Sequence, residues 1–379
     1  MKVTGIICEY NPLHLGHKKQ IDTIRAADPN GIIVCLMSGN YVQRGKPAIA
    51  DKSLRAKAAI LAGADLVLEL PITAALSSAE GFAAEGVRIL SNFCTHLCFG
   101  AETADTDILM QTAKDLLSES FPAMLRVQLE KGSSFPAARA KALEEMGIPA
   151  VTKPNDILAV EYCKAILAQN SPLTPIAIQR GGDYHEKDAD GENPSATAVR
   201  KLMLESGMWL DYVPEEVRDI FRDAKLHRIS AGERMILAKL RTMTDAEFEA
   251  IPFGSEGLWR KLMHNARRFA CLEDVITATK SKRYTRTRLD RMVMCAFLGI
   301  SAETISSPAP YVRVLALNDA GRKILRQKKE SFPVVNAGEA VQDPYWELER
   351  RSGDLYGLFC TDATEPPGTE ERRRVVYVR

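Results

Sequence analysis

The first hundred residues alternate short, uniformly apolar runs with longer stretches in which apolar residues recur every three or four positions. The short runs predict strands, and the longer stretches predict helices. We expect strands at 3–8, 31–37, 64–70 and 95–100, and helices at 17–27, 51–62 and 78–90. Strands that are apolar throughout are typical of a sheet that helices cover on both faces. The pattern therefore predicts an α/β fold built on a doubly wound parallel sheet.

Helical periodicity dominates the next part of the chain. Residues 104–170 are predicted to form a helical insertion, and the apolar run at 173–180 predicts a further strand. A helix is expected to open at Pro194, because proline suits the first helical position. These elements continue the alternation of strands and helices that begins at the N-terminus.

A break in the periodicity at 225–232 predicts a boundary between two domains. The first, residues 1–228, is expected to be the α/β domain with its helical insertion. The second, residues 229–379, is expected to be mostly helical, with strand-like patterns only at 311–316 and 333–336. A chain of 379 residues is too long for one ordinary core, which agrees with this division.

Composition excludes several classes of protein. A hydrophobic content of 46% and a charged content of 26% are typical of globular proteins. The start of the chain lacks a signal-peptide pattern, and no apolar run approaches the roughly 20 residues that span a bilayer. Eight cysteines scattered in apolar stretches predict buried thiols in a reducing cytoplasm. Cys94 and Cys98 lack a second pair at zinc-ribbon spacing, so no metal site is expected.

The segment HLGH, residues 14–17, lies at the corner between the first predicted strand and the first predicted helix. In open parallel sheets, ligands bind beyond the carboxyl ends of the strands, where helix N-termini favour an anion. Gly16 allows a phosphate to approach the backbone, and the two histidines can donate ring N–H bonds to it. Lys18 and Lys19 add positive charge. The corner therefore predicts a nucleotide site, although neither the P-loop nor the GxGxxG pattern is present.

The segment SATAVR, residues 195–200, lies at another predicted helix start, after the strand at 173–180. Its hydroxyl and backbone N–H groups can hold the β- and γ-phosphates of a nucleotide, and Arg200 can neutralise them. The alternative is an ordinary Ser/Thr N-cap followed by an arginine that faces solvent. The two segments together predict that the following side chains carry the chemistry: His14, His17, Lys18, Lys19 and Arg200.

Longer stretches of the chain resemble a known family. HLGH with the later SxTxxR is similar to the HIGH-type nucleotidyltransferase superfamily. GIICEYNPLHLGH, MSGNYVQRGKPAIADK, KPNDILAVEY and SKRYTRTRLDR together resemble the bacterial tRNA(Met) cytidine acetate ligases. These stretches extend from residue 5 to residue 291, so the resemblance covers most of the chain.

The resemblance implies a reaction in two steps. ATP and acetate form acetyl-adenylate and pyrophosphate, with Mg²⁺ expected to bridge the phosphates. The acetyl group then moves to the exocyclic amine of the wobble cytidine in elongator tRNA(Met), which gives N4-acetylcytidine. The resemblance says nothing about the oligomeric state, or about why acetate is the acid used.

The resemblance also implies an ATP site. Carried over residue by residue, with the two hydroxyl residues of SATAVR added, this site comprises Ile7, Cys8, Glu9, Tyr10, Asn11, Pro12, Leu13, His14, Leu15, Gly16, His17, Lys18, Lys19, Gln20, Gly100, Asn155, Arg180, Ser195 and Thr197. Gly100 is expected to let a base or ribose approach the end of its strand. Asn155 can read an adenine edge or a ribose hydroxyl, and the alternative is an N-cap after Pro154.

The loop SGNYVQRG, residues 38–45, follows the second predicted strand at the same edge of the sheet. Gln43 and Arg44 are suited to hold a carboxylate or a base, so we expect them to place acetate or the target cytidine. The alternative is a surface loop without a role in binding.

A strongly basic segment lies in the C-terminal half. Residues 259–292 contain ten Lys and Arg against three Asp and Glu, although the net charge of the whole chain is only +1. Such a concentration predicts a polyanion partner, and Tyr284 is a candidate to stack on an unpaired base. The alternative is a solvated helical face. The residues expected to contact tRNA are Lys280, Lys282, Arg283, Tyr284, Arg286 and Arg288.

Two other functions remain open from the residues alone. A small-molecule adenylyl- or cytidylyltransferase would explain HLGH and SATAVR but would leave the basic segment unused. A non-catalytic RNA-binding protein would explain the basic segment but not the two histidines. The four remaining histidines lack ligand spacing and are expected to be structural: His96, His185, His227 and His264.

Overall fold

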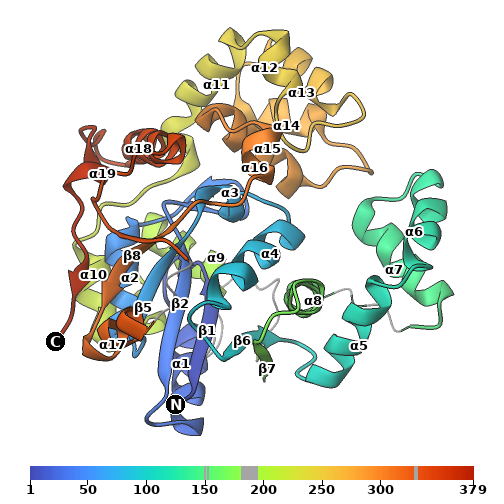
Figure 1. Cartoon of the computed structure of the whole chain (residues 1–379). Coiled ribbons are helices and arrows are strands. Elements are labelled where there is room, and N and C mark those ends of the chain that lie inside the picture. The colour runs from blue at the N-terminus through green and yellow to red at the C-terminus, as the bar shows by residue number, and fades with distance from the viewer. Residues whose placement is uncertain (149–150, 152, 181–194, 328–331) are drawn as a thin grey trace.

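An eight-stranded sheet forms the centre of the computed structural model (Figure 1), which describes residues 1–148, 151, 153–180, 195–327 and 332–379. The strands follow the order β10-β8-β5-β2-β1-β6-β7, with β9 beside β8. Their bounds are β1 Val3–Cys8, β2 Ile32–Ser38, β5 Leu66–Leu70, β6 His96–Ala101, β7 Thr174–Gln179, β8 Val312–Leu317, β9 Val334–Asn336 and β10 Val376–Tyr377. All neighbouring pairs are parallel except β5 with β8. The predicted doubly wound parallel sheet is confirmed.

The strands are apolar throughout because each face of the sheet contributes to a separate core. Along β2, Val34 and Leu36 belong to one core, whereas Ile33, Cys35 and Met37 belong to the other. Successive side chains of a strand point to opposite faces, so both faces need apolar residues.

Helices cover both faces of the sheet. The first core is closed by α4 Ala79–Leu90, α5 Thr106–Leu116, α8 Pro154–Ala168 and α17 Asp319–Gln327. The second core is closed by α1 Leu15–Ala27, α2 Lys52–Leu61, α9 Ala196–Glu205 and α10 Arg218–Arg222. Residues 104–170 are mostly helical, since α6 Phe121–Glu130 and α7 Phe135–Glu145 follow α5 and precede α8 in sequence. That these helices form an insertion stays a prediction. The helix expected at Pro194 begins at Ala196 with Ser195 as its N-cap, and Pro194 lies outside the described residues.

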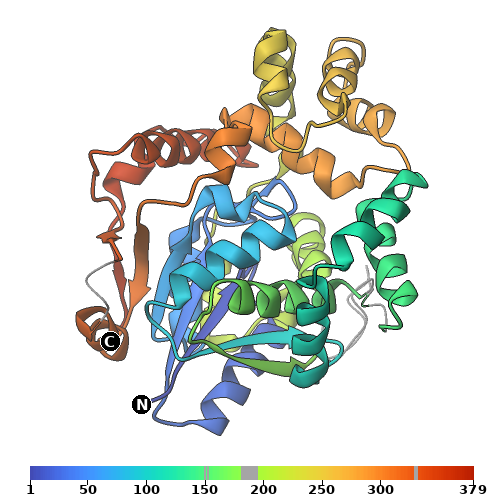
Figure 2. The same cartoon turned by 45° about the vertical axis from the view of Figure 1, so that its right-hand side comes forward.

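The helices of residues 229–306 pack around a third core, beyond the carboxyl ends of the strands (Figures 1 and 2). They are η3 Ile229–Gly232, α11 Glu233–Thr242, α12 Asp245–Glu249, α13 Leu258–Ala266, α14 Leu272–Thr279, α15 Arg286–Leu298 and α16 Ala302–Ser306. Tyr41 and Leu76, from the N-terminal half, also belong to this core, as do Leu348, Tyr356 and Phe359 from the last part of the chain. The remaining elements are β3 Tyr41–Val42, β4 Lys46–Pro47, α3 Ile72–Ala75, η1 Leu210–Tyr212, η2 Glu215–Val217, α18 Pro344–Tyr356, η4 Gly357–Phe359 and α19 Thr369–Arg372.

The last part of the chain returns to the central sheet. β8 is buried along its whole length and pairs antiparallel with β5, and β9 and β10 flank β8. Without β8, the apolar strand β5 would be an exposed edge. The sequence assigned the strand-like patterns at 311–316 and 333–336 to the C-terminal domain, whereas the structure places β8 and β9 in the same sheet as β1. The domain boundary at 225–232 stays a prediction.

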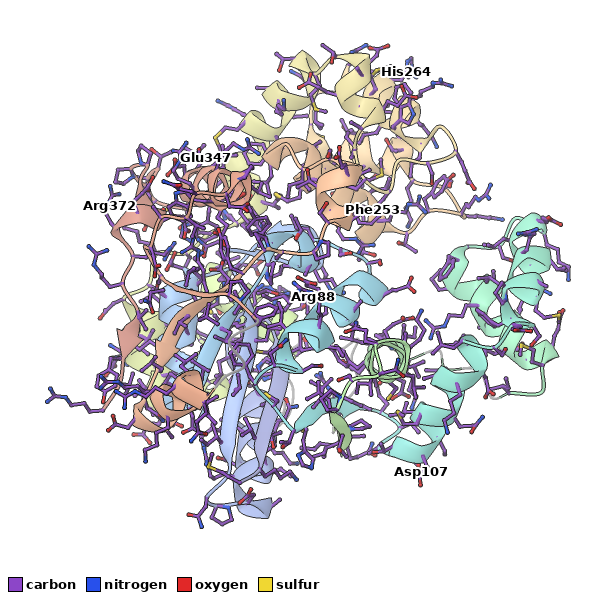
Figure 3. All side chains as sticks on the ribbon, in the orientation of Figure 1. Arg88, Asp107, Phe253, His264, Glu347 and Arg372 are labelled. Carbon is purple, nitrogen blue, oxygen red and sulfur yellow. The ribbon has the colours of Figure 1, made fainter. Side chains whose placement is uncertain are left out.

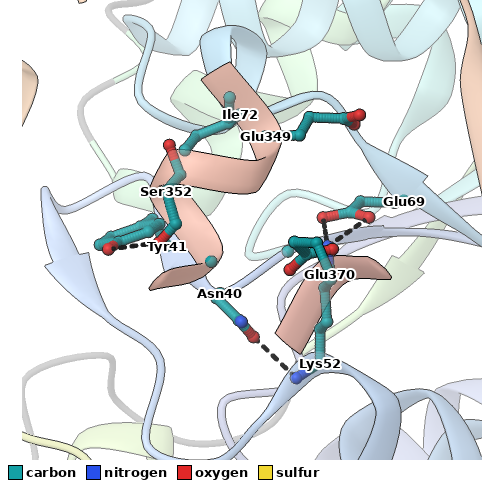
Figure 4. A pocket seen from close by; sticks show the side chains of 10 residues that line it. Asn40, Tyr41, Lys52, Glu69, Ile72, Glu349, Ser352 and Glu370 are labelled. Carbon is teal, nitrogen blue, oxygen red and sulfur yellow. Dashed lines mark hydrogen bonds and ion pairs between the residues drawn. The ribbon is translucent and has the colours of Figure 1, made fainter. Parts of the chain in front are cut away.

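A buried ion network joins this returning segment to the sheet (Figure 4). The ammonium of Lys52 contacts the carboxylate of Glu69 at 2.7 Å and that of Glu370 at 2.9 Å, and all three residues are buried. Arg373 in turn pairs with Asp51 at 2.7 Å. Each buried charge therefore has a partner, which is the condition under which ions are tolerated in a protein interior.

Replacing Lys52 with methionine should reduce the free energy of unfolding by about 3–5 kcal/mol, because Glu69 would remain buried without its cation and Glu370 would keep only Arg373. Urea denaturation measures this loss. The matched control is Lys239→Met, which removes an exposed pair with Glu247 and should cost less than about 1 kcal/mol. Equal losses in the two variants would contradict the structural role of the network.

Candidate active site

A cavity of about 540 Å³ lies at the carboxyl ends of β1 and β6. These two strands flank the point where the strand order reverses, which is where open α/β sheets bind their ligands. The cavity is lined by the end of β1, the start of α1, the β3–β4 hairpin, the end of β6 and the start of α9. The structure thus brings HLGH and SATAVR, about 180 residues apart in sequence, to one site.

His14 and His17 line this cavity at the start of α1. The Nδ1 atom of His14 accepts a hydrogen bond from the backbone N–H of Gly16 at 3.1 Å, and the Nδ1 atom of His17 accepts one from the backbone N–H of His14 at 3.3 Å. The ring centroids are 3.8 Å apart. Because both Nδ1 atoms accept, each neutral ring carries its proton on Nε2. Both rings are therefore hydrogen-bond donors at the cavity.

The surroundings keep both imidazoles neutral. Burial, followed by the charges of Arg180 and Arg200, lowers the pKa of His14 to about 3. Burial, followed by His14 and Arg180, lowers the pKa of His17 well below its usual value. A protonated imidazole would be repelled by these arginines, so the rings stay neutral. They can donate N–H groups to a phosphate without carrying a charge themselves.

Arg200 connects α9 to the HLGH corner. Its guanidinium donates to the backbone oxygen of Asn11 at 2.6 Å and to the hydroxyl of Thr197 at 2.9 Å. Burial lowers the pKa of Arg200 to about 10, so the group remains charged at neutral pH. The alternative of a solvent-facing arginine is therefore wrong. Ser195 is an N-cap, as the alternative interpretation expected: its hydroxyl accepts a hydrogen bond from the backbone N–H of Ala198 at 3.2 Å.

Asn155 lies in the first turn of α8, after the N-cap residue Lys153, and so it caps nothing. Its side-chain amide donates to Glu102 at 2.6 Å and accepts from the guanidinium of Arg180 at 3.1 Å. Gly100 matters for the same arginine, because a Cβ atom there would lie 2.9 Å from the Arg180 Cγ. Gly100 itself lines the cavity, and a side chain at this position would have to displace Arg180; its approach to a base or ribose stays a prediction.

The two lysines of the corner lie differently. Lys19 lines the cavity, but Lys18 pairs with Asp22 at 2.5 Å and lies 3.9 Å from Glu216. Successive residues of a helix point about 100° apart, and Lys18 lies on the side of α1 where Asp22 holds its ammonium. The described structure therefore does not support direct participation of Lys18. Three other residues of the implied ATP site also lie off the lining and support the loop by packing: Pro12, Leu13 and Leu15.

The β3–β4 hairpin presents Gln43 and Arg44 to the cavity, as expected. The backbone N–H of Gln43 donates to the Glu9 carboxylate at 2.8 Å. Gly45 adopts a φ of +68° and lies against the backbone of α15, where a Cβ atom would come within 2.4 Å of the Asp290 carbonyl carbon. The hairpin thus links the cavity to the helix that carries three arginines of the basic segment.

Sequence reasoning missed two parts of the lining. Phe82, Phe99, Leu158 and Tyr162 form an apolar side of the cavity. They come from three separate elements, α4, β6 and α8, so no single local pattern identifies them as a set. The segment 227–229 also lines the cavity, although its broken periodicity had indicated only a domain boundary.

The residues expected to contact tRNA are partly engaged within the protein. Arg286 forms ion pairs with Glu273 at 2.6 Å and Asp290 at 3.0 Å, and Arg283 pairs with Glu256 at 2.9 Å. Tyr284 donates to Glu256, and the Arg288 guanidinium lies 4.9 Å from its ring centroid. Arg288 also donates to the backbone oxygen of Phe253. Exposed positive charge nearby comes from Lys280 and Lys282.

The other described histidines take varied places. His227 is buried and stacks on Tyr356 with ring centroids 4.0 Å apart, whereas His264 is exposed on α13 (Figure 3). His96 lies in β6 and contacts the hydroxyl of Thr95 at 2.8 Å, and His185 lies outside the described residues. Within the described ranges, no group of three or more His, Cys, Asp or Glu is arranged to hold a metal ion, and no helix is long and apolar enough to cross a membrane.

The fold and the corner geometry define a HIGH-type nucleotidyltransferase, and the family model described as HIGH Nucleotidyl Transferase matches residues 1–371. The chain is similar to the tRNA(Met) cytidine acetate ligases of Clostridium novyi, at 37% identity over 95% of this chain and 96% of the relative, and of Clostridium perfringens, at 35% over the same shares. That of Acetivibrio thermocellus is 33% identical over the whole of both chains.

Crystal structures of Thermotoga maritima TmcAL superpose on the whole chain with 28% identity. The TM-score is 0.91 for its apo form and 0.88 for the form bound with alpha-thio ATP, and all of each chain is covered. The present chain therefore belongs to the tRNA(Met) cytidine acetate ligase family, and it is an enzyme.

The neutral histidines should make stability depend on pH. The unfolded chain binds protons at these rings near pH 6.5, whereas the folded chain does not until about pH 3 for His14. Since the unfolded state then holds more protons, the free energy of unfolding should fall as the pH drops below 6.5, by up to about 1.4 kcal/mol per pH unit for each ring.

Urea denaturation of the wild type and of His14→Gln between about pH 7 and pH 5 tests this sign. In the variant, the free energy of unfolding should change less with pH, by up to about 1.4 kcal/mol per pH unit, because one titrating ring is absent. A wild-type stability that rises on acidification through this range, or an unchanged slope in the variant, would contradict the neutral state of His14.

Proposed function

We propose that this chain forms acetyl-adenylate from ATP and acetate and transfers the acetyl group to the N4 amine of the wobble cytidine in elongator tRNA(Met). The observation that carries the proposal is the cavity in which HLGH and SATAVR meet at the reversal point of the sheet. Its relatives are named for this reaction, and a structural neighbour was crystallised with alpha-thio ATP.

The first step brings the acetate carboxylate against an α-phosphate that already carries negative charge. Catalysis of such a step rests on positioning and on stabilising the charge that develops on phosphate oxygens. His14 and His17 would donate their Nε2–H groups to the α-phosphate, and Arg200, Thr197 and the N-terminus of α9 would hold the β- and γ-phosphates.

The opposite end of the nucleotide would contact the Asn155–Arg180 pair. Glu102 fixes the orientation of the Asn155 amide, so Asn155 and Arg180 present a defined set of polar atoms to the adenosine. Arg44 and Gln43, across the cavity, would place the acetate or the incoming cytidine.

Mg²⁺ would arrive with the triphosphate. Among the described lining residues Glu9 is the one carboxylate, which does not make a protein cage for the ion, and Mg²⁺ commonly binds through substrate phosphates and water. When bound, it would neutralise charge between phosphate oxygens. A cytoplasmic location is also part of the proposal, supported by eight cysteines that are all free thiols, six of them buried.

The helical region of residues 229–306 would bind the tRNA. Its exposed cations suit a phosphate backbone, and the contact of Gly45 with α15 places the hairpin of the cavity next to this region. An anticodon loop on this surface would have its wobble base near the hairpin.

Incubating the protein with ATP, labelled acetate and bacterial tRNA tests the function. Label in N4-acetylcytidine of tRNA(Met) is the expected result. Acid-labile acetyl-adenylate without labelled RNA would favour a small-molecule nucleotidyltransferase, and neither product would favour a non-catalytic RNA-binding protein.

Binding of tRNA should weaken steeply as salt is added. Lys280→Ala and Lys282→Ala should each reduce the slope of log K against log salt by about 1, because each removes one phosphate contact. Arg286→Ala should change the slope less, since Glu273 and Asp290 already hold this guanidinium. Filter binding at several salt concentrations measures the slopes. The surface would be wrongly placed if the wild-type affinity were independent of salt.

A further inference from the structure

Glu9 is the one acidic side chain among the described residues that line the cavity. The charged residues around it are otherwise basic: Lys19, Arg44, Lys46, Arg180, Arg200 and Arg228. A cavity that receives a triphosphate and a carboxylic acid gains from cations and loses from a carboxylate, since like charges at close range repel. The presence of Glu9 is therefore explained best by a role in a step of the reaction that needs a carboxylate.

The position of Glu9 is held firmly. Its backbone oxygen accepts from the guanidinium of Arg55 at 2.7 Å, and its Oε1 atom accepts from the backbone N–H of Gln43 at 2.8 Å. Arg55 is fully buried and also binds backbone oxygens of Ser38 and Ala50. Among the described residues, none donates a hydrogen bond to the Oε2 atom of Glu9. One carboxylate oxygen thus remains available to a ligand in the cavity.

The other titratable groups of the cavity are poor proton acceptors. His14 and His17 use their Nδ1 lone pairs on backbone N–H groups. Burial raises the pKa of Cys8 and of Tyr162 well above the usual values, so both keep their protons at neutral pH. His227 has its Nε2 atom 3.3 Å from Glu365 and is covered by a tyrosine ring.

The two steps of the reaction differ in their need for a base. In the first, an acetate oxygen attacks the α-phosphorus and pyrophosphate leaves, so no proton moves. In the second, the N4 amine attacks the acetyl carbonyl carbon, a C–N bond forms, and the nitrogen must lose a proton. The C–O bond to the phosphate then breaks, and AMP leaves with the electron pair.

We propose that Glu9 is the general base of the second step: its free carboxylate oxygen accepts the proton that N4 of cytidine loses as the acetyl C–N bond forms. The proposal rests on the proposed function. The same oxygen accepts a hydrogen bond from the N4 amine before reaction, and it repels the O4 carbonyl that uridine carries at this position. The carboxylate thereby also favours cytidine over uridine.

The test separates the two steps in Glu9→Gln, which keeps an oxygen for the Gln43 N–H but cannot take a proton. Acetate-dependent ATP–pyrophosphate exchange measures the first step, and single-turnover transfer from enzyme-bound acetyl-adenylate to tRNA(Met) measures the second. The transfer rate at saturating tRNA should fall by about 10²–10⁴-fold, which is far more than any loss of exchange.

Two further variants complete the test. Glu80→Gln makes the same change at an exposed residue of α4, whose partner is Lys164, and should leave both rates unchanged. Glu9→Asp keeps a carboxylate on a shorter side chain and should transfer faster than Glu9→Gln.

Three results would overturn the proposal: unchanged transfer in Glu9→Gln, an equal loss of exchange and transfer, or no advantage of Glu9→Asp. Equal losses would assign Glu9 to nucleotide or Mg²⁺ binding instead. Failure of the wild type to exchange, or to label tRNA, would count against the proposed function itself.

Discussion

The neutrality of His14 and His17 is the constraint on which the rest of the site depends. Burial and the guanidinium of Arg180 exclude a proton from both rings, and Arg200 adds to this effect at His14. Backbone N–H groups occupy the Nδ1 atoms of both rings. The rings can then only donate. They can stabilise a phosphate beside permanent cations without being repelled, and proton acceptance must fall to a different group.

The charged residues of the cavity come from distant parts of the chain. Arginine side chains that donate hydrogen bonds to backbone oxygens hold these parts together. Arg200 ties α9 to the corner through Asn11, and Arg55 ties the ends of β1 and β2 through Glu9 and Ser38. Donors fixed in this way need little rearrangement when charge develops in a transition state. The contact of Gly45 with α15 extends the same framework to the helices that are proposed to bind tRNA.

The parts of this arrangement that follow from local patterns could be predicted. Uniformly apolar strands such as Ile32–Ser38 predict a sheet covered on both faces, and HLGH at a strand-to-helix corner predicts an anion site. The orientation of Lys18 could not be predicted, because it depends on Asp22 and Glu216. Nor could the addition of β8 to the sheet, since antiparallel pairing with β5 is a contact between segments about 250 residues apart.

The protonation state of the two histidines tests the central claim most directly. Protein labelled with ¹⁵N-histidine, with the signals of its six histidines assigned by single substitutions, reports the state and tautomer of each ring through its nitrogen chemical shifts. The account predicts that His14 and His17 remain neutral, with the proton on Nε2, from about pH 8 to about pH 5. A ring at either position that becomes protonated near pH 6.5, or that carries its proton on Nδ1, would contradict it.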